Sequence, residues 1–197
     1  IDGDLSRPAE RFSSSDSLDL AHQLRAQSMA ILVGVGTVLR DNPSLTVRRG
    51  VKIKPRNNPI RIVIDPNNRI PSNSKVMTDG LAKTLLIQSS RFDESKDLDH
   101  VERIEISETD IAISKILDML GDMDIQSLLV EGGANTWTRF LDSGLVDIVH
   151  LCVSPINLLG GNKIEITPEK LEKWGYIEFD NFKNSEDDIS KWKKHLD

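Results

Sequence analysis

Two glycines and two arginines gather around one apolar run in the first quarter of the chain. The run over 29–35 includes Gly34 and is followed by Gly36. Glycines at the end of a strand let the backbone approach a ligand closely. Arg25 precedes the run and Arg48 follows it. A guanidinium group offers paired donors that match a phosphate ester. The spacing therefore predicts a site for a ligand of nucleotide size.

A second glycine pair follows another apolar run, at Glu131-Gly132-Gly133. We interpret it as a strand-to-helix junction, where the free N–H groups of the following helix attract a phosphate. A carboxylate such as Glu131, at the carboxyl end of a central strand, faces the crevice in which open α/β sheets bind ligands. Two simpler interpretations stay open: the glycines serve a tight turn, and Glu131 interacts with the helix dipole.

The usual dinucleotide fingerprint is incomplete around Gly34 and Gly36. Its third glycine is missing, and residues 38–43 are predicted to form a short turn where the fingerprint requires a helix. A dinucleotide would then bind in another way. The histidines show no ligand spacing, and each is interpreted as solvated or hydrogen-bonded, so no metal site is predicted: His22, His100, His150 and His195.

Strand-like and helical patterns alternate along the chain, which favours an α/β protein with a mostly parallel central sheet and flanking helices. The 197 residues are predicted to form a single domain. Segments 49–58 and 89–100 read as loops, and no element is assigned beyond residue 161. Helices are expected at 16–27, 109–120 and 135–142, and strands at 29–35, 60–64, 84–87, 127–130 and 146–153.

The net charge of −6 argues against nucleic acid or an anionic membrane surface as the main partner. No apolar run approaches the ~20 residues that span a bilayer. A single cysteine excludes an internal disulfide and indicates a reducing compartment, so we expect a cytoplasmic protein. The chain begins at Ile1 without a methionine, and an upstream strand is expected to be missing.

Several segments resemble, in order, the pyrimidine reductases of riboflavin biosynthesis. These are the C-terminal reductase domain of the bifunctional deaminase–reductase and its stand-alone archaeal and fungal counterparts. The resemblance lies in residues 1–3, 24–48, 58–65, 130–133 and 144–147. It implies a dihydrofolate-reductase-like α/β fold, a homodimer, and NADPH as the reductant of the ribosylamino side chain of a pyrimidine 5′-phosphate.

The resemblance also implies roles for individual residues. The arginines suit the substrate phosphate. Once the hydride has been transferred, the proton would come from water or from a nearby acid, for which Glu131 is the candidate. The substrate would contact Arg25, Leu45, Arg48 and Glu131. NADPH would be held by Thr37, Asp41, Gly133, Ala134, Asn135 and Thr136, with Pro66, Asn67, Asn68 and Arg69 near its adenosine end.

The turn at 33–37 resembles the archaeal and fungal enzymes, and no zinc-deaminase signature is present. The expected substrate is therefore 2,5-diamino-6-ribosylamino-4(3H)-pyrimidinone 5′-phosphate. Three alternatives stay open. The substrate could be 5-amino-6-(5-phosphoribosylamino)uracil, the chain could reduce another heterocycle, or it could be a nucleotide-binding module without catalysis.

Overall fold

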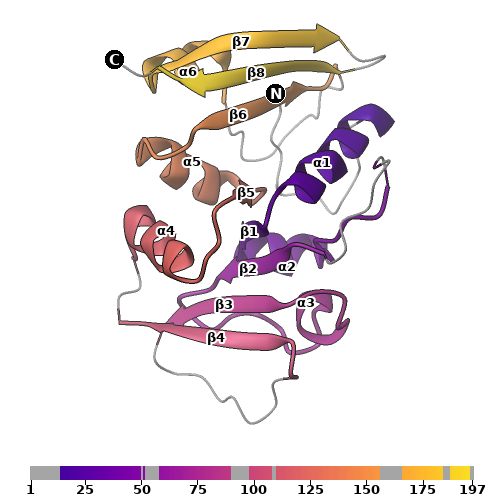
Figure 1. Ribbon diagram of the computed structural model, residues 1–197, viewed down its shortest axis with the longest axis vertical. Coiled ribbons are helices and arrows are strands. Elements are labelled where there is room, and N and C mark those ends of the chain that lie inside the picture. The colour runs from indigo at the N-terminus through magenta and orange to yellow at the C-terminus, as the bar shows by residue number, and fades with distance from the viewer. Residues whose placement is uncertain are drawn as a thin grey trace.

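The computed structural model describes residues 14–49, 51, 58–89, 98–107, 110–155, 166–183 and 187–195. The expected N-terminal motif at residues 1–3 lies outside these ranges. Within them the chain folds into two sheets, a larger parallel one and a smaller antiparallel one, at opposite ends of an elongated molecule (Figure 1).

The parallel sheet has five strands in the order β4-β3-β2-β1-β5, and all neighbours pair in parallel. The two central strands are nearly continuous apolar runs, as expected for strands covered on both faces. Their bounds are β1 Ala30–Gly34, β2 Ile60–Ile64, β3 Thr84–Ser89, β4 Val101–Ile106 and β5 Leu128–Val130. The mostly parallel sheet predicted from the sequence is confirmed.

Helices cover both faces of this sheet. One face packs against α4 (Ile113–Asp122) and α5 (Ala134–Asp142), through side chains that include Leu32 and Ile116. The other face packs against α2 (Val35–Asp41) and α3 (Lys75–Thr78), through side chains that include Val33. The sheet is therefore a buried layer, and ligands reach it at its strand ends.

Strand β2 also carries a fully buried arginine. The Arg61 guanidinium lies 2.7 Å from Asp79 Oδ1 and donates to Thr84 Oγ1 at 3.0 Å. It donates further to the carbonyl oxygens of Ser44 at 3.3 Å and Ala82 at 2.6 Å. A buried charge needs such a complete set of partners, so Arg61 ties β2 to the segments that surround it.

The second sheet is antiparallel, with the order β6-β8-β7, and α6 (Pro168–Lys173), between β6 and β7 in the chain, shares a small core with it around Leu171 and Trp192. Its strands are β6 Ile148–Val153, β7 Tyr176–Lys183 and β8 Asp188–Lys194. Helix α1 (Ser15–Gln27) is fastened to this sheet because Asp187 Oδ2 accepts from Ser14 N at 3.0 Å and also from Ser17 Oγ.

The structure differs from the expected elements in three places. Residues 38–43 do not form a turn, because α2 begins directly after β1 and ends only where Asn42 takes a left-handed φ of 40°. Directly after the predicted loop 89–100, where no element was predicted, lies β4, an edge strand whose charged side chains hide its pattern. Past residue 161, α6, β7 and β8 form most of the second sheet and its core.

Among the described residues, no helix combines the length and the apolar character needed to cross a membrane.

Candidate active site

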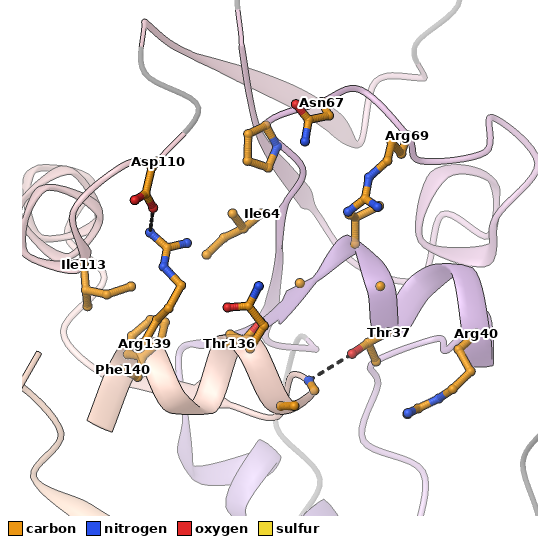
Figure 2. A pocket seen from close by; sticks show the side chains of 17 residues that line it. Thr37, Arg40, Ile64, Asn67, Arg69, Asp110, Ile113, Thr136, Arg139 and Phe140 are labelled. Carbon is orange, nitrogen blue, oxygen red and sulfur yellow. Dashed lines mark hydrogen bonds and ion pairs between the residues drawn. The ribbon is translucent and has the colours of Figure 1, made fainter. Parts of the chain in front are cut away.

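A cavity of about 730 Å³ opens where the carboxyl ends of β1, β2 and β5 meet. This volume lies within the range of sites for small molecules and cofactors. Two of its walls are helix starts: residues 34–37 lead into α2, and residues 133–136 lead into α5. Thr37 Oγ1 accepts a hydrogen bond from Gly133 N at 3.1 Å, which joins the two walls (Figure 2).

The glycines around the cavity differ in whether a side chain would fit at their position. A Cβ on Gly34 would lie 2.6 Å from Thr136 Oγ1, and a Cβ on Gly132 would lie 2.9 Å from the Gly34 nitrogen. Both glycines are therefore required by the close approach of β1 to the start of α5. Gly36 is different, because a Cβ there would meet nothing within 4 Å. Since Gly36 lines the cavity, the space beside it is available to a ligand.

Arginines from three elements reach the cavity lining. Arg40, on α2, is held by the next residue, with its Nη2 2.6 Å from Asp41 Oδ2. Arg139, on α5, donates through Nη2 to Asp110 Oδ1 at 2.9 Å. In the described part of the chain no side chain pairs with Arg69, which lies across the cavity from Arg139 (Figure 2). Arg69 is thus ready for an anionic group of a ligand.

The loop that carries Arg69 is fixed by a buried carboxylate. Asp65, the residue after β2, accepts from Ile70 N at 2.8 Å and from Gln88 Nε2 at 3.2 Å through its Oδ2 atom. The Asn68 N–H donates to the Asp65 carbonyl at 3.2 Å. Because the loop is hydrogen-bonded to Asp65 at two points, the loop residues that line the cavity are held in place at the edge of the sheet.

On the other side of the β5 end, Glu131 faces α1 instead of the cavity. Its two carboxylate oxygens accept from Nε and Nη2 of Arg25, each at 2.6 Å. The Nη1 atom of Arg25 donates to the Thr46 carbonyl at 3.1 Å. This forked pair of charge-assisted bonds is rigid, and it places a guanidinium beside the segment that carries Arg48.

That segment, residues 46–49, runs along α1. The Arg48 N–H donates to His22 Nδ1 at 3.2 Å, and the Arg49 Nη2 atom donates to Ser15 Oγ at 2.6 Å. Burial and the neighbouring charges of Arg25, Arg48 and Arg49 lower the pKa of His22, against the opposing effect of Glu131. Three cations therefore surround a histidine that stays neutral.

The structure brings most of the predicted cofactor residues together and separates a few. Asp41 is exposed and paired with Arg40, and neither Asp41 nor Asn68 is among the lining residues. Seven residues predicted from the sequence to hold a cofactor line the cavity together with Thr37: Pro66, Asn67, Arg69, Gly133, Ala134, Asn135 and Thr136.

Of the residues predicted to contact the substrate, three lie near one another and one is buried in the core. Arg25 and Glu131 are in contact. Arg25 also donates to the carbonyl oxygen of Thr46, two residues before Arg48. Leu45 as a whole is 1% exposed and belongs to the core beneath α2 and α3, so it has almost no surface at which a ligand could meet it. Leu45 has a left-handed φ of 48°, which turns the chain toward α1.

Arg139, Asp110 and His22 are among the residues of the site that escaped the sequence analysis. Arg139 and Asp110 lie on separate elements, and their ion pair at the cavity has no local signature. His22 was interpreted as an ordinary polar histidine. Its position three residues before Arg25, on the same face of a helix, was the signal that could have identified it.

Comparison with known proteins agrees with this geometry. The model of the family described as the RibD C-terminal domain matches residues 1–190. The 2,5-diamino-6-ribosylamino-4(3H)-pyrimidinone 5′-phosphate reductase of Archaeoglobus fulgidus is 33% identical over 167 residues, which cover 80% of this chain and 75% of the relative. The riboflavin biosynthesis protein RibD of Bacillus amyloliquefaciens is 38% identical over 146 residues.

The shares covered differ between these relatives. The match covers 72% of this chain but 38% of the Bacillus protein, and a RibD from Aquifex aeolicus is covered to 39%. The chain thus spans about two fifths of the length of these two relatives.

Solved structures show the same fold. Acinetobacter baumannii RibD superposes with a TM-score of 0.80 at 23% identity, covering all of this chain and 56% of that one. The riboflavin biosynthesis reductase Rib7 of Saccharomyces cerevisia gives 0.73 at 23% identity, covering 98% and 85%. The α/β fold is that of the dihydrofolate-reductase-like reductases. With its matched length, its sheet order and its cavity at the strand ends, this chain belongs to the RibD C-terminal domain family.

Proposed function

We propose that this protein reduces the ribosylamino side chain of 2,5-diamino-6-ribosylamino-4(3H)-pyrimidinone 5′-phosphate to a ribitylamino chain, with NADPH as reductant. One observation carries the proposal. The end of β5 separates two sites, because Glu131 faces the arginines of the α1 side while Gly133, two residues later, lines the cavity. A cofactor and a phosphorylated substrate would therefore meet across one strand end.

The cavity residues suit a dinucleotide phosphate. Helix α5 starts at the cavity without a side-chain cap, so its first N–H groups are available to a pyrophosphate. Arg69, on the loop after Pro66, would take an anionic group at the adenosine end, such as the 2′-phosphate that distinguishes NADPH from NADH. Gly36 leaves the space that the cofactor requires.

The residues along α1 suit the phosphorylated pyrimidine. Arg48, which is exposed, would bind the phosphate. Arg25 and Glu131 would contact the substrate as a preassembled pair.

When bound, the nicotinamide supplies a hydride to C1′ of the ring-opened sugar imine. The chain's residues contribute position and charge. Glu131 holds Arg25 with both carboxylate oxygens, and a carboxylate engaged in this way orients a cation and has no proton to donate. We therefore assign Glu131 to positioning Arg25 and assign the proton to water. Of the two proton sources considered from the sequence, water is thus preferred to Glu131.

We also propose a homodimer that works in the cytoplasm, where a chain with a single cysteine needs no oxidising compartment. The dimer is supported by apolar side chains on one face of the second sheet. Ile148 and Ile177 both pair with Lys193 in the strand register, and they are 52% and 41% exposed. Phe179, 47% exposed, lies with its ring centroid 5.8 Å from the Lys193 ammonium.

The decisive test is NADPH oxidation by the full-length protein, followed at the nicotinamide absorbance, with the diaminopyrimidinone and the aminouracil phosphates as separate substrates. Consumption that matches formation of the ribityl product from the first compound supports the proposal. Faster turnover of the aminouracil would transfer the assignment to that substrate. Saturable NADPH binding with no turnover of either compound would contradict reduction and favour another heterocycle or a non-catalytic role.

A further inference from the structure

Helix α1 holds the 46–49 segment through a row of contacts on one helix face. In order toward the start of α1, Arg25 donates to the Thr46 carbonyl at 3.1 Å, His22 accepts from Arg48 N at 3.2 Å, and Asp19 accepts from Arg49 Nε at 2.5 Å. The segment therefore runs antiparallel to the helix. Helix residues three apart lie on the same face, which explains why the three contacts form a line.

Within this row His22 makes the central contact and differs from its neighbours in kind. Arg25 and Asp19 use charged groups, whereas His22 offers a neutral lone pair to a backbone N–H. Its side chain is buried, with the whole residue 6% exposed. For Nδ1 to accept, the ring must carry its proton on Nε2. The backbone of Arg48 is thereby fixed at the point from which its guanidinium leaves the segment.

We propose that His22 is a positioning residue for the substrate phosphate, acting through Arg48: its neutral imidazole fixes the Arg48 backbone against α1 and so aims the guanidinium at the ligand. The ligand half of this statement rests on the proposed function, in which Arg48 meets the phosphate. The positioning half concerns the fold alone. The two halves are tested separately below.

The charges around His22 explain why a histidine can serve here. The groups that face it are Arg25 on α1, Arg48 and Arg49 on the segment, and Glu131 after β5. Burial and the three guanidinium groups lower the pKa of His22 from its ordinary value of 6.5, and only Glu131 raises it. The acceptor form is therefore present at neutral pH. It is lost in acid below pH 6.5, when the protonated ring donates at both nitrogens and releases the Arg48 N–H.

The first experiment compares His22→Asn, whose amide oxygen can replace the Nδ1 acceptor, with His22→Leu, which has no acceptor. We expect His22→Leu to raise KM for the diaminopyrimidinone phosphate about tenfold, the scale of one lost hydrogen bond, while His22→Asn recovers most of it. The values of kcat and of Kd for NADPH should change little in both. His195→Asn, an exposed histidine after β8, is the matched control.

The route through Arg48 is tested by a double-mutant cycle. In an Arg48→Ala background, adding His22→Leu should cause no further rise in KM, because the side chain that His22 aims is gone. Additive effects of the two substitutions would overturn the route through Arg48. A fall in kcat with unchanged KM in His22→Leu would overturn positioning in favour of a direct catalytic role.

Acid should weaken substrate binding more in the wild type than in the His22→Asn variant. As the pH falls from 7 to 5, the substrate phosphate gains its second proton near pH ~6 in every assay, so its contribution cancels between proteins. The additional rise in KM of the wild type over His22→Asn reports protonation of His22. Identical pH profiles of KM in the two proteins would contradict the proposal.

A second experiment does not depend on turnover. Nitrogen NMR of the imidazole should show the Nε2–H tautomer at pH 7, and the Arg48 amide should exchange slowly in the wild type and rapidly in His22→Leu. An Nδ1–H tautomer, or an Arg48 amide that exchanges equally fast in both proteins, would overturn the positioning role. Calorimetric titration with ribose 5-phosphate then tests the ligand half: weaker binding by His22→Leu and by Arg48→Ala supports it, and equal binding by all proteins rejects it.

Discussion

At the scale of single residues, the site is defined by the ion pairs that its charged side chains already form. Glu131 is committed to Arg25, Arg40 to Asp41 and Arg139 to Asp110, whereas Arg69 has no partner within the described ranges. The identities of these residues were predictable from the sequence in large part, but their pairings were not. The Arg25–Glu131 pair joins residues 106 positions apart, and no local pattern encodes such a separation.

The role of Glu131 can be measured directly. Glu131→Gln removes the negative charge that orients Arg25, and we expect it to raise KM for the pyrimidine phosphate by about tenfold while kcat falls less. Steady-state kinetics at saturating NADPH provide the comparison. A large loss of kcat at unchanged KM would restore the proton-donor role.

The space beside Gly36 gives a second prediction for a single residue. A Cβ at Gly36 meets no protein atom within 4 Å and the residue lines the cavity, so for Gly36→Leu we expect the Kd for NADPH to rise at least ~tenfold with little change in thermal stability. Gly121→Leu, on α4, is the matched control because a Cβ there also meets nothing within 4 Å and lies outside the cavity. Fluorescence titration with NADPH distinguishes the two. Equal affinities would remove Gly36 from the cofactor site.

At the scale of elements, predictability followed the continuity of the apolar pattern. The runs that form β1 and β2 are unbroken, and both strands were predicted to within one residue at either end. Strand β4 mixes apolar residues with charges at the sheet edge, so no strand was predicted there. Helix α2 was missed because Asn42 and Pro43, which stop it, suggested a turn over its whole second half.

Strand β2 also tests how a buried charge supports an element. Arg61→Met would remove the guanidinium that pairs with the Asp79 carboxylate and donates to two carbonyl oxygens, and we expect a loss of about 3–5 kcal/mol in the free energy of unfolding. Urea titration measures it. Lys83→Ala, which breaks the exposed pair with Glu102, is the control and should cost at most ~1 kcal/mol. A similar small loss for both variants would mean that Arg61 contributes little.

At the scale of the whole molecule, the second sheet was the least predictable part. Its strands β7 and β8 are rich in charges, and its core depends on residues brought together from five elements, among them Tyr176 and Trp192. Such contacts arise only after the chain has folded back on itself. Sequence periodicity does not report them.

The outer face of this sheet makes a prediction about assembly. Ile148→Asp should convert the proposed dimer into a monomer, because a carboxylate would be buried against the partner copy. Sedimentation velocity gives the mass of the particle, and Leu98→Asp, which alters an exposed apolar residue before β4, serves as control. A wild type that sediments as a monomer would remove the dimer from the proposal.

The attachment of α1 has a consequence for how such proteins diverge. Asp187 fastens α1 to the antiparallel sheet, while the cofactor cavity rests on the ends of the parallel one. Of the groups assigned to the substrate phosphate, Arg25 lies on α1 and Arg48 is bonded to it, whereas the residues assigned to NADPH line the cavity. Substitutions on α1 and in residues 46–49 would therefore change recognition of the substrate phosphate while the lining of the cofactor cavity stays the same.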